Sequence, residues 1–366
     1  MAAKGSLNLE NEVLNQSLCT SCGACVNICP YIKVVKDRVA VVEPCGITDG
    51  HCYDYCPRTP TDISELDRKL FGKERSDSSL GSYRLIRIAQ AKNDILRARA
   101  QYGGVVSGLI GYALDSGAVQ SAIMARPLDS NLMPHAVLVR DESEVVSCSG
   151  SSYVPASTLA ALNQVMKEGH DNIGMVALPC QVLALRKMQA SGHQPAADRV
   201  NLVIGLFCTW ALSYKGIKGY LSEKVDIPSI RRLDIPPPPA NILRVITSSG
   251  DLEMSLDDVR KFVKPTCALC FDMTSEFADI SVGMVEGVND WNTVIVRTPA
   301  GEKLFDSARE AGIAHVDALQ GERLAHLREA SALKKKRAIA GLIARSGNED
   351  DLLYLRLSER ERAEFR

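Results

Sequence analysis

The stretch Cys19-Thr-Ser-Cys22-Gly-Ala-Cys25-Val-Asn-Ile-Cys29-Pro30 places four cysteines in one short run. Gaps of two residues let a tight turn aim successive sulfurs at one cluster, and the longer gap before Cys29-Pro30 turns the chain away. In iron–sulfur proteins with this spacing, three cysteines hold one cluster and the fourth crosses to a second. Disulfide frameworks are typical of small secreted domains, and zinc sites usually need two separated pairs. The run therefore predicts an iron–sulfur module.

A second half of this ferredoxin-like module lies at Cys45-Gly-Ile-Thr-Asp-Gly-His-Cys52-Tyr-Asp-Tyr-Cys56-Pro57. Its end repeats the end of the first run, so the crossing rule predicts two ligand groups. One group is Cys19, Cys22, Cys25 and Cys56, and the other is Cys29, Cys45 and Cys52.

The second group is one thiolate short of a 4Fe-4S site. Asp49 or His51 is a candidate fourth ligand, because both lie between Cys45 and Cys52. A cysteine from elsewhere, or a three-iron cluster, is the other solution, and the sequence leaves these alternatives open.

The composition is that of a globular protein with room for two domains: 366 residues, 46% hydrophobic and 24% charged. A net charge of -1 gives no argument for nucleic-acid binding, and we interpret the basic run Lys334-Lys335-Lys336-Arg337 as a solvated helix face. Residues 1–15 lack the apolar region of a signal peptide, and the longest apolar run, near Leu202, is shorter than the ~20 residues of a membrane span. We therefore expect a cytoplasmic protein whose twelve cysteines stay reduced for metal binding.

Four segments are expected along the chain. Residues 1–60 form the ferredoxin-like module, with a strand over residues 34–42. Residues 61–82 form a linker that contains a helix over residues 62–71, and residues 83–318 form the body. Residues 319–366 form a charged helical extension whose end frays. In the body, strands that alternate with helices are expected at residues 85–89, 121–125, 136–140, 174–178, 202–207, 243–246, 280–284 and 294–297. Pro236 to Pro239 are expected to form an extended connection. The predicted fold is thus a ferredoxin-like module followed by a mixed α/β or α+β body.

Three stretches of the body carry candidate chemistry. Gln101-Tyr-Gly103-Gly104-Val-Val-Ser107-Gly108 leads into an apolar helix that runs to about Asp115, where backbone N–H groups can approach a phosphate. Cys148-Ser-Gly150-Ser-Ser152-Tyr153 is a small polar loop in which we expect Cys148 to be a buried core residue.

The third stretch is a dispersed set of four cysteines: Cys180, Cys208, Cys267 and Cys270. The first two follow the carboxyl ends of predicted strands, where open α/β sheets gather their ligands, and the others form a C-x-x-C pair. Four thiolates suffice for one more cluster, although a redox pair with two core cysteines fits the spacing equally well.

From about Tyr83 to Glu310 the chain resembles the family of coenzyme F420 hydrogenase beta subunits, which also includes formate dehydrogenase beta subunits and chlorophyll-pathway reductases. The resemblance rests on six ordered motifs: Gln101-Tyr-Gly-Gly-Val-Val-Ser-Gly-Leu, Gly150-Ser-Ser-Tyr153, Val176-Ala-Leu-Pro-Cys-Gln181 with Leu185-Arg-Lys-Met188, Ile204-Gly-Leu-Phe-Cys208, Cys267-Ala-Leu-Cys270 with Ala278-Asp-Ile-Ser-Val-Gly283, and Trp291-Asn-Thr-Val-Ile-Val-Arg-Thr298.

The resemblance implies FAD against the glycine-rich segment and a 4Fe-4S cluster on Cys180, Cys208, Cys267 and Cys270. The flavin-contacting residues that it implies are Gly103, Gly104, Ser107, Ser152, Tyr153, Asn292 and Thr293. The chain departs from relatives that have Gly-Thr-Lys-Tyr at Gly150–Tyr153 and Gly-Trp-Ser-Thr at Asp290–Thr293, and the missing lysine leaves the two-electron partner open.

The function expected is that of an FAD and iron–sulfur oxidoreductase with about three clusters. It would link a hydride carrier such as coenzyme F420 to redox subunits of a hydrogenase, formate dehydrogenase or heterodisulfide-reductase-like complex, or to ferredoxin. The alternatives are a stand-alone ferredoxin-dependent reductase of an organic substrate and a pure electron relay. No acid–base residue is expected, because hydride transfer to a flavin needs none, and Asp279 and Arg297 are equally compatible with structural ion pairs.

Overall fold

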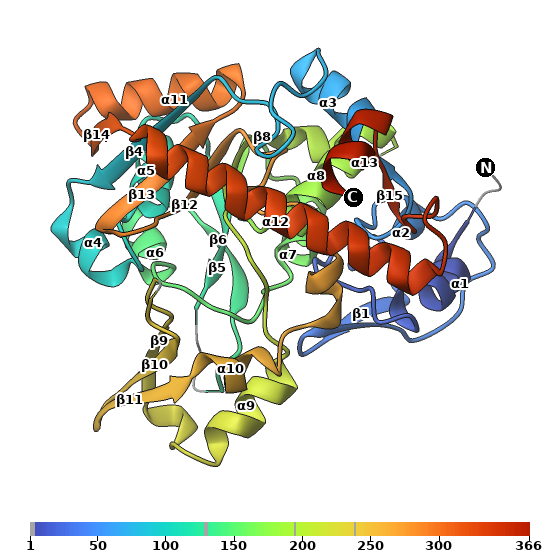
Figure 1. The fold of residues 1–366 in the computed structure, drawn as a ribbon, viewed down its shortest axis with the longest axis horizontal. Helices are drawn as coiled ribbons and strands as arrows, with labels where there is room; N and C mark the ends of the chain where they lie inside the picture. The colour runs from blue at the N-terminus through green and yellow to red at the C-terminus, as the bar shows by residue number, and fades with distance from the viewer. Residues whose placement is uncertain (1–3, 128–130, 194, 238) are drawn as a thin grey trace.

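The computed structural model describes residues 4–127, 131–193, 195–237 and 239–366. An eight-stranded mixed sheet runs through the body in the order β14-β4-β13-β12-β8-β7-β5-β6 (Figure 1). Its strands are β4 (Leu85–Ala91), β5 (Ser121–Arg126), β6 (His135–Val139), β7 (Ile173–Ala177), β8 (Val200–Leu206), β12 (Ile280–Val285), β13 (Val288–Val296) and β14 (Ala314–Ala318). The mixed α/β body expected from the sequence is confirmed.

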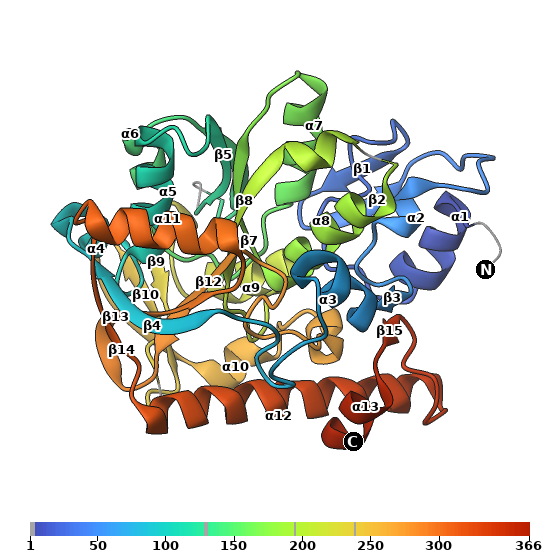
Figure 2. The same ribbon diagram turned by 90° about the horizontal axis from the view of Figure 1, so that it is seen from above.

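The four central strands β5, β7, β8 and β12 are mutually parallel, so their carboxyl ends share one edge of the sheet. They are largely apolar, as expected for strands that helices cover on both faces; all five residues of β7, for example, are buried. Helices α5 (Val105–Asp115), α6 (Glu142–Ser147) and α11 (Pro299–Glu310) pack on one face. Helices α7 (Thr158–Lys167), α8 (Pro179–Ser191) and α12 (Gly321–Ser346) pack on the other (Figure 2).

A smaller antiparallel sheet extends from the body at residues 230–255. It consists of β9 (Ile230–Asp234), β10 (Ile242–Thr247) and β11 (Gly250–Ser255), with α9 (Tyr214–Ser222) and α10 (Leu256–Arg260) packed on its own core. The strands β9 and β11, and β14 in the main sheet, were not predicted. The proline connection joins β9 to β10; Pro236 and Pro237 have no regular structure, Pro239 lies in a turn, and residue 238 lies outside the described residues.

The N-terminal module contains α1 (Ser6–Leu9), a π-helical turn (Glu10–Leu14), β1 (Ile32–Val35), β2 (Arg38–Val41) and α2 (His51–Asp54). The prediction of one strand over residues 34–42 is wrong, because β1 and β2 form an antiparallel hairpin. Lys36 adopts a left-handed φ of 58° at the turn, and the carboxylate of Asp37 accepts a hydrogen bond from Lys264 at 3.2 Å. This distant lysine holds the turn in place.

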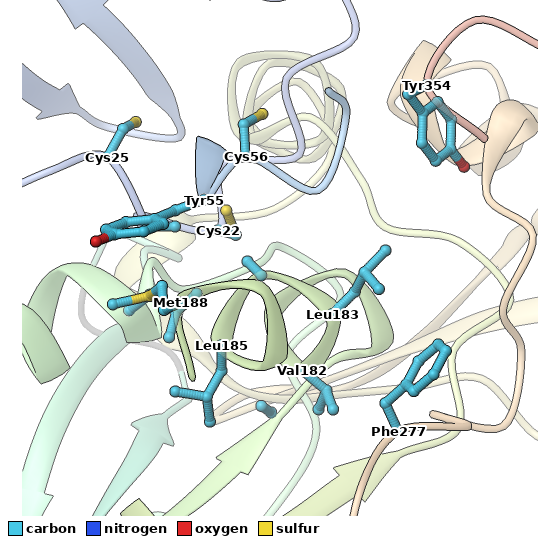
Figure 3. Packing of buried hydrophobic residues seen from close by; sticks show 14 of the residues in the cluster. Cys22, Cys25, Tyr55, Cys56, Val182, Leu183, Leu185, Met188, Phe277 and Tyr354 are labelled. Atoms are coloured by element: carbon cyan, nitrogen blue, oxygen red, sulfur yellow. The ribbon is translucent and has the colours of Figure 1, made fainter. Parts of the chain in front are cut away.

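The module shares its hydrophobic core with helices α7 and α8 of the body. Figure 3 shows Cys22 and Cys56 on one side of α8, whose Val182 and Leu185 point to the other side. The Asn163 side chain of α7 donates hydrogen bonds to module carbonyls, including that of Val26 at 2.7 Å. A Cβ on Gly23 would lie 2.5 Å from the backbone nitrogen of Ala160, so glycine permits this close approach.

The segment predicted as a linker begins with β3 (Thr61–Asp62) and α3 (Ile63–Phe71), which Asp62 caps by accepting from the backbone N–H of Glu65. Its remainder is fixed by Arg75, which forms ion pairs with Asp67 and Glu276 at 2.7 Å each.

The C-terminal segment is an ordered part of the structure. Helix α12 crosses the molecule from β14 to the module, β15 (Leu355–Arg356) pairs with β3, and α13 (Glu359–Phe365) follows (Figure 2). Where fraying was expected, the chain forms α13, and Phe365 is 1% exposed and packs edge-on against Phe271. No helix in the described ranges is long and apolar enough to cross a membrane.

Candidate functional site

The four dispersed cysteines of the body line one partly open cavity. Cys180 lies in the first turn of α8, directly after β7, and Cys208 follows β8, so both lie at the carboxyl edge of the parallel strands. Cys267 lies in the 3-10 turn Pro265–Leu269 and Cys270 immediately follows it. The structure thus brings together the residues that the sequence grouped, at the predicted edge of the sheet.

The thiols around this cavity differ in their electrostatic surroundings. Burial raises the pKa of Cys180 and of Cys208 well above the ordinary thiol value. Burial acts the same way on Cys270, but the nearby charges of Lys334 and Arg58 outweigh it and lower the pKa of that thiol. Cluster assembly at such a site must release thiol protons, which makes metal binding depend on pH.

Lys334 and Lys335 are buried, and the prediction that this basic run is a solvated helix face is wrong. Lys334 is 4% exposed and Lys335 is fully buried. Lys334 lines the cysteine cavity, whereas Lys335 forms an ion pair with Glu276 and lies 3.8 Å from the Phe271 ring centroid. The helix packs against the body along this side, whereas Lys336 and Arg337, the other half of the run, are exposed as predicted.

A second cavity lies inside the module. Its lining includes Cys19, Cys22, Cys25 and Cys56, the group that the crossing rule predicts. Burial raises the pKa of the Cys22 thiol to about 12 and that of Cys56 to about 11. Backbone N–H groups of Ser21 and Arg58 point at the sulfurs of Cys19 and Cys56, each at 3.4 Å. Such N–H groups stabilise thiolates and the clusters that thiolates hold.

The remaining module cysteines, Cys29, Cys45 and Cys52, lie close enough to interact. Burial first, and then the charges of Cys29 and Cys45, raise the pKa of Cys52 to about 11. Of the two fourth ligands proposed from sequence, Asp49 is exposed, and the His51 ring stacks on Tyr55 and His193 with centroids 5.5 Å and 5.0 Å away.

Ser6 adds a candidate that sequence reasoning missed. Its buried hydroxyl oxygen lies 3.1 Å from the sulfur of Cys45. Ser6 is far from Cys45 in the chain, so no spacing rule could have found it.

The two cavities adjoin. Thr20 lines both of them, and Cys22 of the module interacts electrostatically with Cys180 of the body. Within the described residues, no group of three or more His, Cys, Asp or Glu side chains is placed to bind a single metal ion.

The glycine-rich segment lies at the same edge of the sheet, after β4. The carbonyl of Gly103 accepts from the backbone N–H of Ala91 at 2.7 Å, and Gly104, with a left-handed φ of 71°, begins α5. The Asn292 side chain of β13 accepts from the backbone N–H of Val105 at 3.3 Å and donates to the carbonyl of Gly283 at 3.1 Å. Gly103, Gly104 and Asn292 are therefore neighbours, and Ser107 follows one turn along α5, bonded to Ser149.

Tyr153 closes this region from the side of the small sheet. Its hydroxyl accepts from the Gln101 side chain and from the backbone N–H of Ile235, both at 2.8 Å. Its ring centroid lies 6.4 Å from that of Trp210, which lines the body cysteine cavity. The glycine segment and the cysteine cavity are thus linked through two aromatic side chains.

Two predicted flavin contacts are directed elsewhere in the structure. The hydroxyl of Ser152 donates to the carbonyl of Val154 in its own loop. Side chains alternate along a strand, so Thr293 points to the opposite face of the sheet from Asn292, and its hydroxyl donates to the carbonyl of Met284 at 3.1 Å.

Asp279 and Arg297 serve the fold. The carboxylate of Asp279 accepts from Arg186 at 3.1 Å, from the backbone N–H of Val203 and from Thr298, and all of these groups are buried or nearly so. Arg297 donates to the carbonyls of Leu80, Ser82 and Thr274. Cys148 is 5% exposed and lines neither cysteine cavity, as expected for a core residue.

Comparison with known proteins connects this arrangement to one family. Residues 86–163 and 170–322 match the N-terminal and C-terminal parts of the coenzyme F420 hydrogenase/dehydrogenase beta subunit, and residues 12–31 match the 4Fe-4S binding domain.

Three similar curated proteins act on or with coenzyme F420 according to their names. The beta subunit of coenzyme F420 hydrogenase from Methanothermobacter thermautotrophicus is 29% identical over 73% of this chain and 96% of its own. A subunit of the F(420)H(2) dehydrogenase of Methanosarcina mazei is 27% identical over 82% of this chain and 84% of its own. The coenzyme F420-dependent sulfite reductase of Methanocaldococcus jannaschii is 28% identical over 89% of this chain but only 50% of its own.

A solved structure of the F420-reducing NiFe hydrogenase complex from Methanosarcina barkeri contains a chain with the same fold. The TM-score is 0.67 at 24% identity, over 73% of this chain and 95% of that one. Taken with the two matched family segments, these similarities show that the chain belongs to the oxidoreductase family of coenzyme F420 hydrogenase/dehydrogenase beta subunits and carries a 4Fe-4S binding domain in its N-terminal module.

Proposed function

We propose that the protein is an electron-transfer subunit with FAD and iron–sulfur clusters. It would couple a two-electron hydride carrier, coenzyme F420 or a similar deazaflavin, to the one-electron chain of a hydrogenase, formate dehydrogenase or heterodisulfide-reductase-like complex. The supporting observation is a continuous series of candidate sites. Trp210 links the Tyr153 region to the body cavity, and Thr20 lines both that cavity and the cavity of the module.

The residues around the two cavities fit iron–sulfur clusters. Each cavity is lined by four cysteines, and backbone N–H groups point at sulfurs in both; in the body, that of Ala211 lies 3.3 Å from the sulfur of Cys267. The proposed ligands are Cys180, Cys208, Cys267 and Cys270 in the body and Cys19, Cys22, Cys25 and Cys56 in the module. Cys29, Cys45 and Cys52 would hold the third cluster, with Ser6, Asp49 or His51 as candidates to complete it.

The glycine segment fits a flavin with a pyrophosphate. Gly104 leads into a helix of eleven residues, whose first-turn N–H groups and dipole favour an anion. We propose Gly103, Gly104, Ser107 and Tyr153 as its contacts. Ser152, Asn292 and Thr293 would support the site indirectly: Asn292 holds the start of α5 through Val105, and the side chains of Ser152 and Thr293 bond to their own loop and to β12. When bound, a flavin accepts an electron pair as hydride and releases electrons singly, which iron–sulfur clusters then carry.

The surface of the module supports a role for it at the exit of the electron path. Five large hydrophobic side chains are exposed there by 42–63%: Leu7, Tyr31, Val35, Val42 and Ile47. Tyr31 and Val35 lie on the outer face of the β1–β2 hairpin. We propose that another redox subunit or a ferredoxin docks on the hairpin, where Tyr31 and Val42 are exposed cross-strand neighbours, because clustered exposed apolar side chains mark interaction sites. Thiolates that hold iron must stay reduced, so we also propose a cytoplasmic location.

A stand-alone reductase is the second candidate. It is favoured by the sulfite reductase relative, because that similarity extends over 89% of this chain, more than the 73% matched by the hydrogenase beta subunit. Purification distinguishes the two: an active free protein supports the reductase, and co-purification with other redox proteins supports membership of a complex.

The decisive experiment compares the wild type with Cys267→Ser after anaerobic purification. Flavin reduction by reduced F420, NADH or reduced ferredoxin is followed by stopped flow, and electron delivery to a one-electron acceptor is measured in parallel. We expect Cys267→Ser to keep hydride-dependent flavin reduction and to lose electron delivery, whereas Cys148→Ser, a buried control outside both cavities, keeps both. A wild type without flavin, or wild-type delivery by Cys267→Ser, would refute the proposal.

A further inference from the structure

Three cations line the body cysteine cavity: Arg58, Lys264 and Lys334. Lys264 forms an ion pair with Asp37, whereas Arg58 and Lys334, each only 4% exposed, are the two considered below. Arg58 comes from the module, two residues after Cys56, and Lys334 comes from α12. The segments that match the family and the 4Fe-4S binding domain are residues 12–31, 86–163 and 170–322, and both cations lie outside them.

Lys334 has no carboxylate ion pair in the part of the chain that the structure describes. Its ammonium donates to the carbonyls of Cys208 at 2.5 Å and Asp272 at 2.9 Å. Lys335, the next residue, pairs directly with Glu276. The carboxyl group of Asp272 interacts with Lys334 at longer range, and burial raises the pKa of that carboxyl. A buried ammonium held only by carbonyls needs a negative charge nearby, because burial of an unpaired ion is costly.

Arg58 shows the same pattern from the opposite side. Its guanidinium donates to the hydroxyl of Thr266 at 3.0 Å and to the Thr266 carbonyl at 3.3 Å, and it lies 4.6 Å from the Tyr354 ring centroid. It too forms no carboxylate ion pair among the described residues. The negative partners that face both cations are the cysteine sulfurs, since both interact electrostatically with Cys267 and Cys270.

We propose that Lys334 and Arg58 tune the reduction potential of the body cluster, with their fixed positive charges compensating the negative charge of its four thiolates. This inference rests on the proposed function, in which those thiolates hold a cluster. Reduction adds one electron to a buried site, so a cation there stabilises the reduced form more than the oxidised form. The pair therefore raises the potential of the body cluster.

The two cations act on different sets of thiols. Lys334 interacts with Cys208, Cys267 and Cys270 of the body. Arg58 interacts with Cys180, Cys267 and Cys270 and also with Cys56 of the module. Removal of the Lys334 charge should therefore shift the body cluster, and removal of the Arg58 charge should shift both the body cluster and the cluster that Cys56 would hold.

The test is a redox titration of the whole protein followed by electron paramagnetic resonance, with iron content measured on the same samples. The body signal is the one that Cys267→Ser removes. The variants are Lys334→Met, Lys334→Gln, which keeps N–H donors without charge, Lys334→Arg, which keeps the charge, and Arg58→Met. Lys336→Met is the matched control, because Lys336 lies two residues along the same helix and is exposed.

We expect the body potential to fall in both neutral Lys334 variants and in Arg58→Met, and to match the wild type in Lys334→Arg and Lys336→Met. Loss of the body cluster from both neutral variants but not from Lys334→Arg also supports a required charge. An unchanged potential in a neutral variant with wild-type iron overturns the inference, and so does cluster loss in Lys334→Arg. If Cys267→Ser removes no iron and no signal, the proposed function itself fails.

Discussion

Replacing Gly104 with valine tests whether the start of α5 binds the flavin. Gly104 adopts φ 71°, a left-handed conformation that costs a β-branched residue about 1–3 kcal/mol. A Cβ there would contact Ala91 and the backbone of Leu96 and Arg97 in α4 (Asp94–Arg99) at 3.4 Å, so the outer methyl groups add overpacking of similar size. Relaxation of this strain rotates the first turn of α5 and breaks the bond from Val105 to Asn292.

The effect on flavin affinity follows from this strain. If the variant gains about 1–3 kcal/mol by leaving the native conformation, flavin binding must restore that conformation, which weakens affinity roughly 5–150-fold. A stability of about 5–15 kcal/mol leaves the variant folded.

Gly117→Val is the matched control for the Gly104 variant. Gly117 has the same φ of 71°, follows the end of the same helix, and has open space around its Cβ. Urea unfolding should show a loss of stability in both variants, while flavin absorbance after gel filtration should fall only in Gly104→Val. Full flavin retention in a folded Gly104→Val protein would contradict the placement, and equal loss from both variants would show that the effect is nonspecific.

Three further predictions concern metal, packing and pH. Anaerobic iron analysis of the wild type should give about twelve iron atoms if all three sites hold cubanes, and about eleven with one three-iron site. The Cys267→Ser variant should contain about four fewer. A wild-type count near four would exclude a two-cluster module. Asp279→Asn should destabilise the protein by about 3–5 kcal/mol, because it leaves Arg186 buried without its charged partner. The flavin spectrum should stay unchanged. A smaller loss of stability in urea unfolding would contradict the structural role of Asp279. Burial raises the pKa of Asp67 to about 6, so protonation of this carboxyl favours the folded state. This stabilisation is complete below the ordinary carboxyl pKa and is lost as pH rises through about 6. The free energy of unfolding measured across this range should therefore fall with pH in the wild type and change less in Asp67→Asn.

The sequence predicts the central strands well because burial on both faces leaves a readable pattern. Strands such as β7 and β8 are short apolar runs between polar turns, and the expected bounds agree to within one or two residues. The strands that were missed are at sheet edges or outside the main sheet: β11 has five of its six residues exposed, and β9 contains two adjacent arginines. Their pairing depends on neighbours rather than on their own hydrophobicity.

The cysteine groups could be predicted because ligand spacing is a local property of the chain. The residues around the cysteines could not, because they arrive from distant segments. In the sequence, Lys334 is indistinguishable from the other charged residues of its helix. Its contact with Cys208 becomes evident only from the packing of α12 on the body. Ser6 reaches Cys45, and Lys264 reaches the Asp37 turn, in the same way, through tertiary contacts that carry no periodic signal.

The hydrophobic core that the module shares with α7 and α8 also restricts movement of the module relative to the body. A module held by its own core on a flexible tether could swing between partners, and turnover would then wait for that motion. Here Asn163 and the close approach at Gly23 join the module to α7, so the spacing between the two cysteine cavities is set when the chain folds. Electron exchange between the two proposed clusters would therefore be independent of domain movement and insensitive to solvent viscosity. For the same reason the module is not an exchangeable cassette, because its removal would expose the apolar surface of α7 and α8 to water.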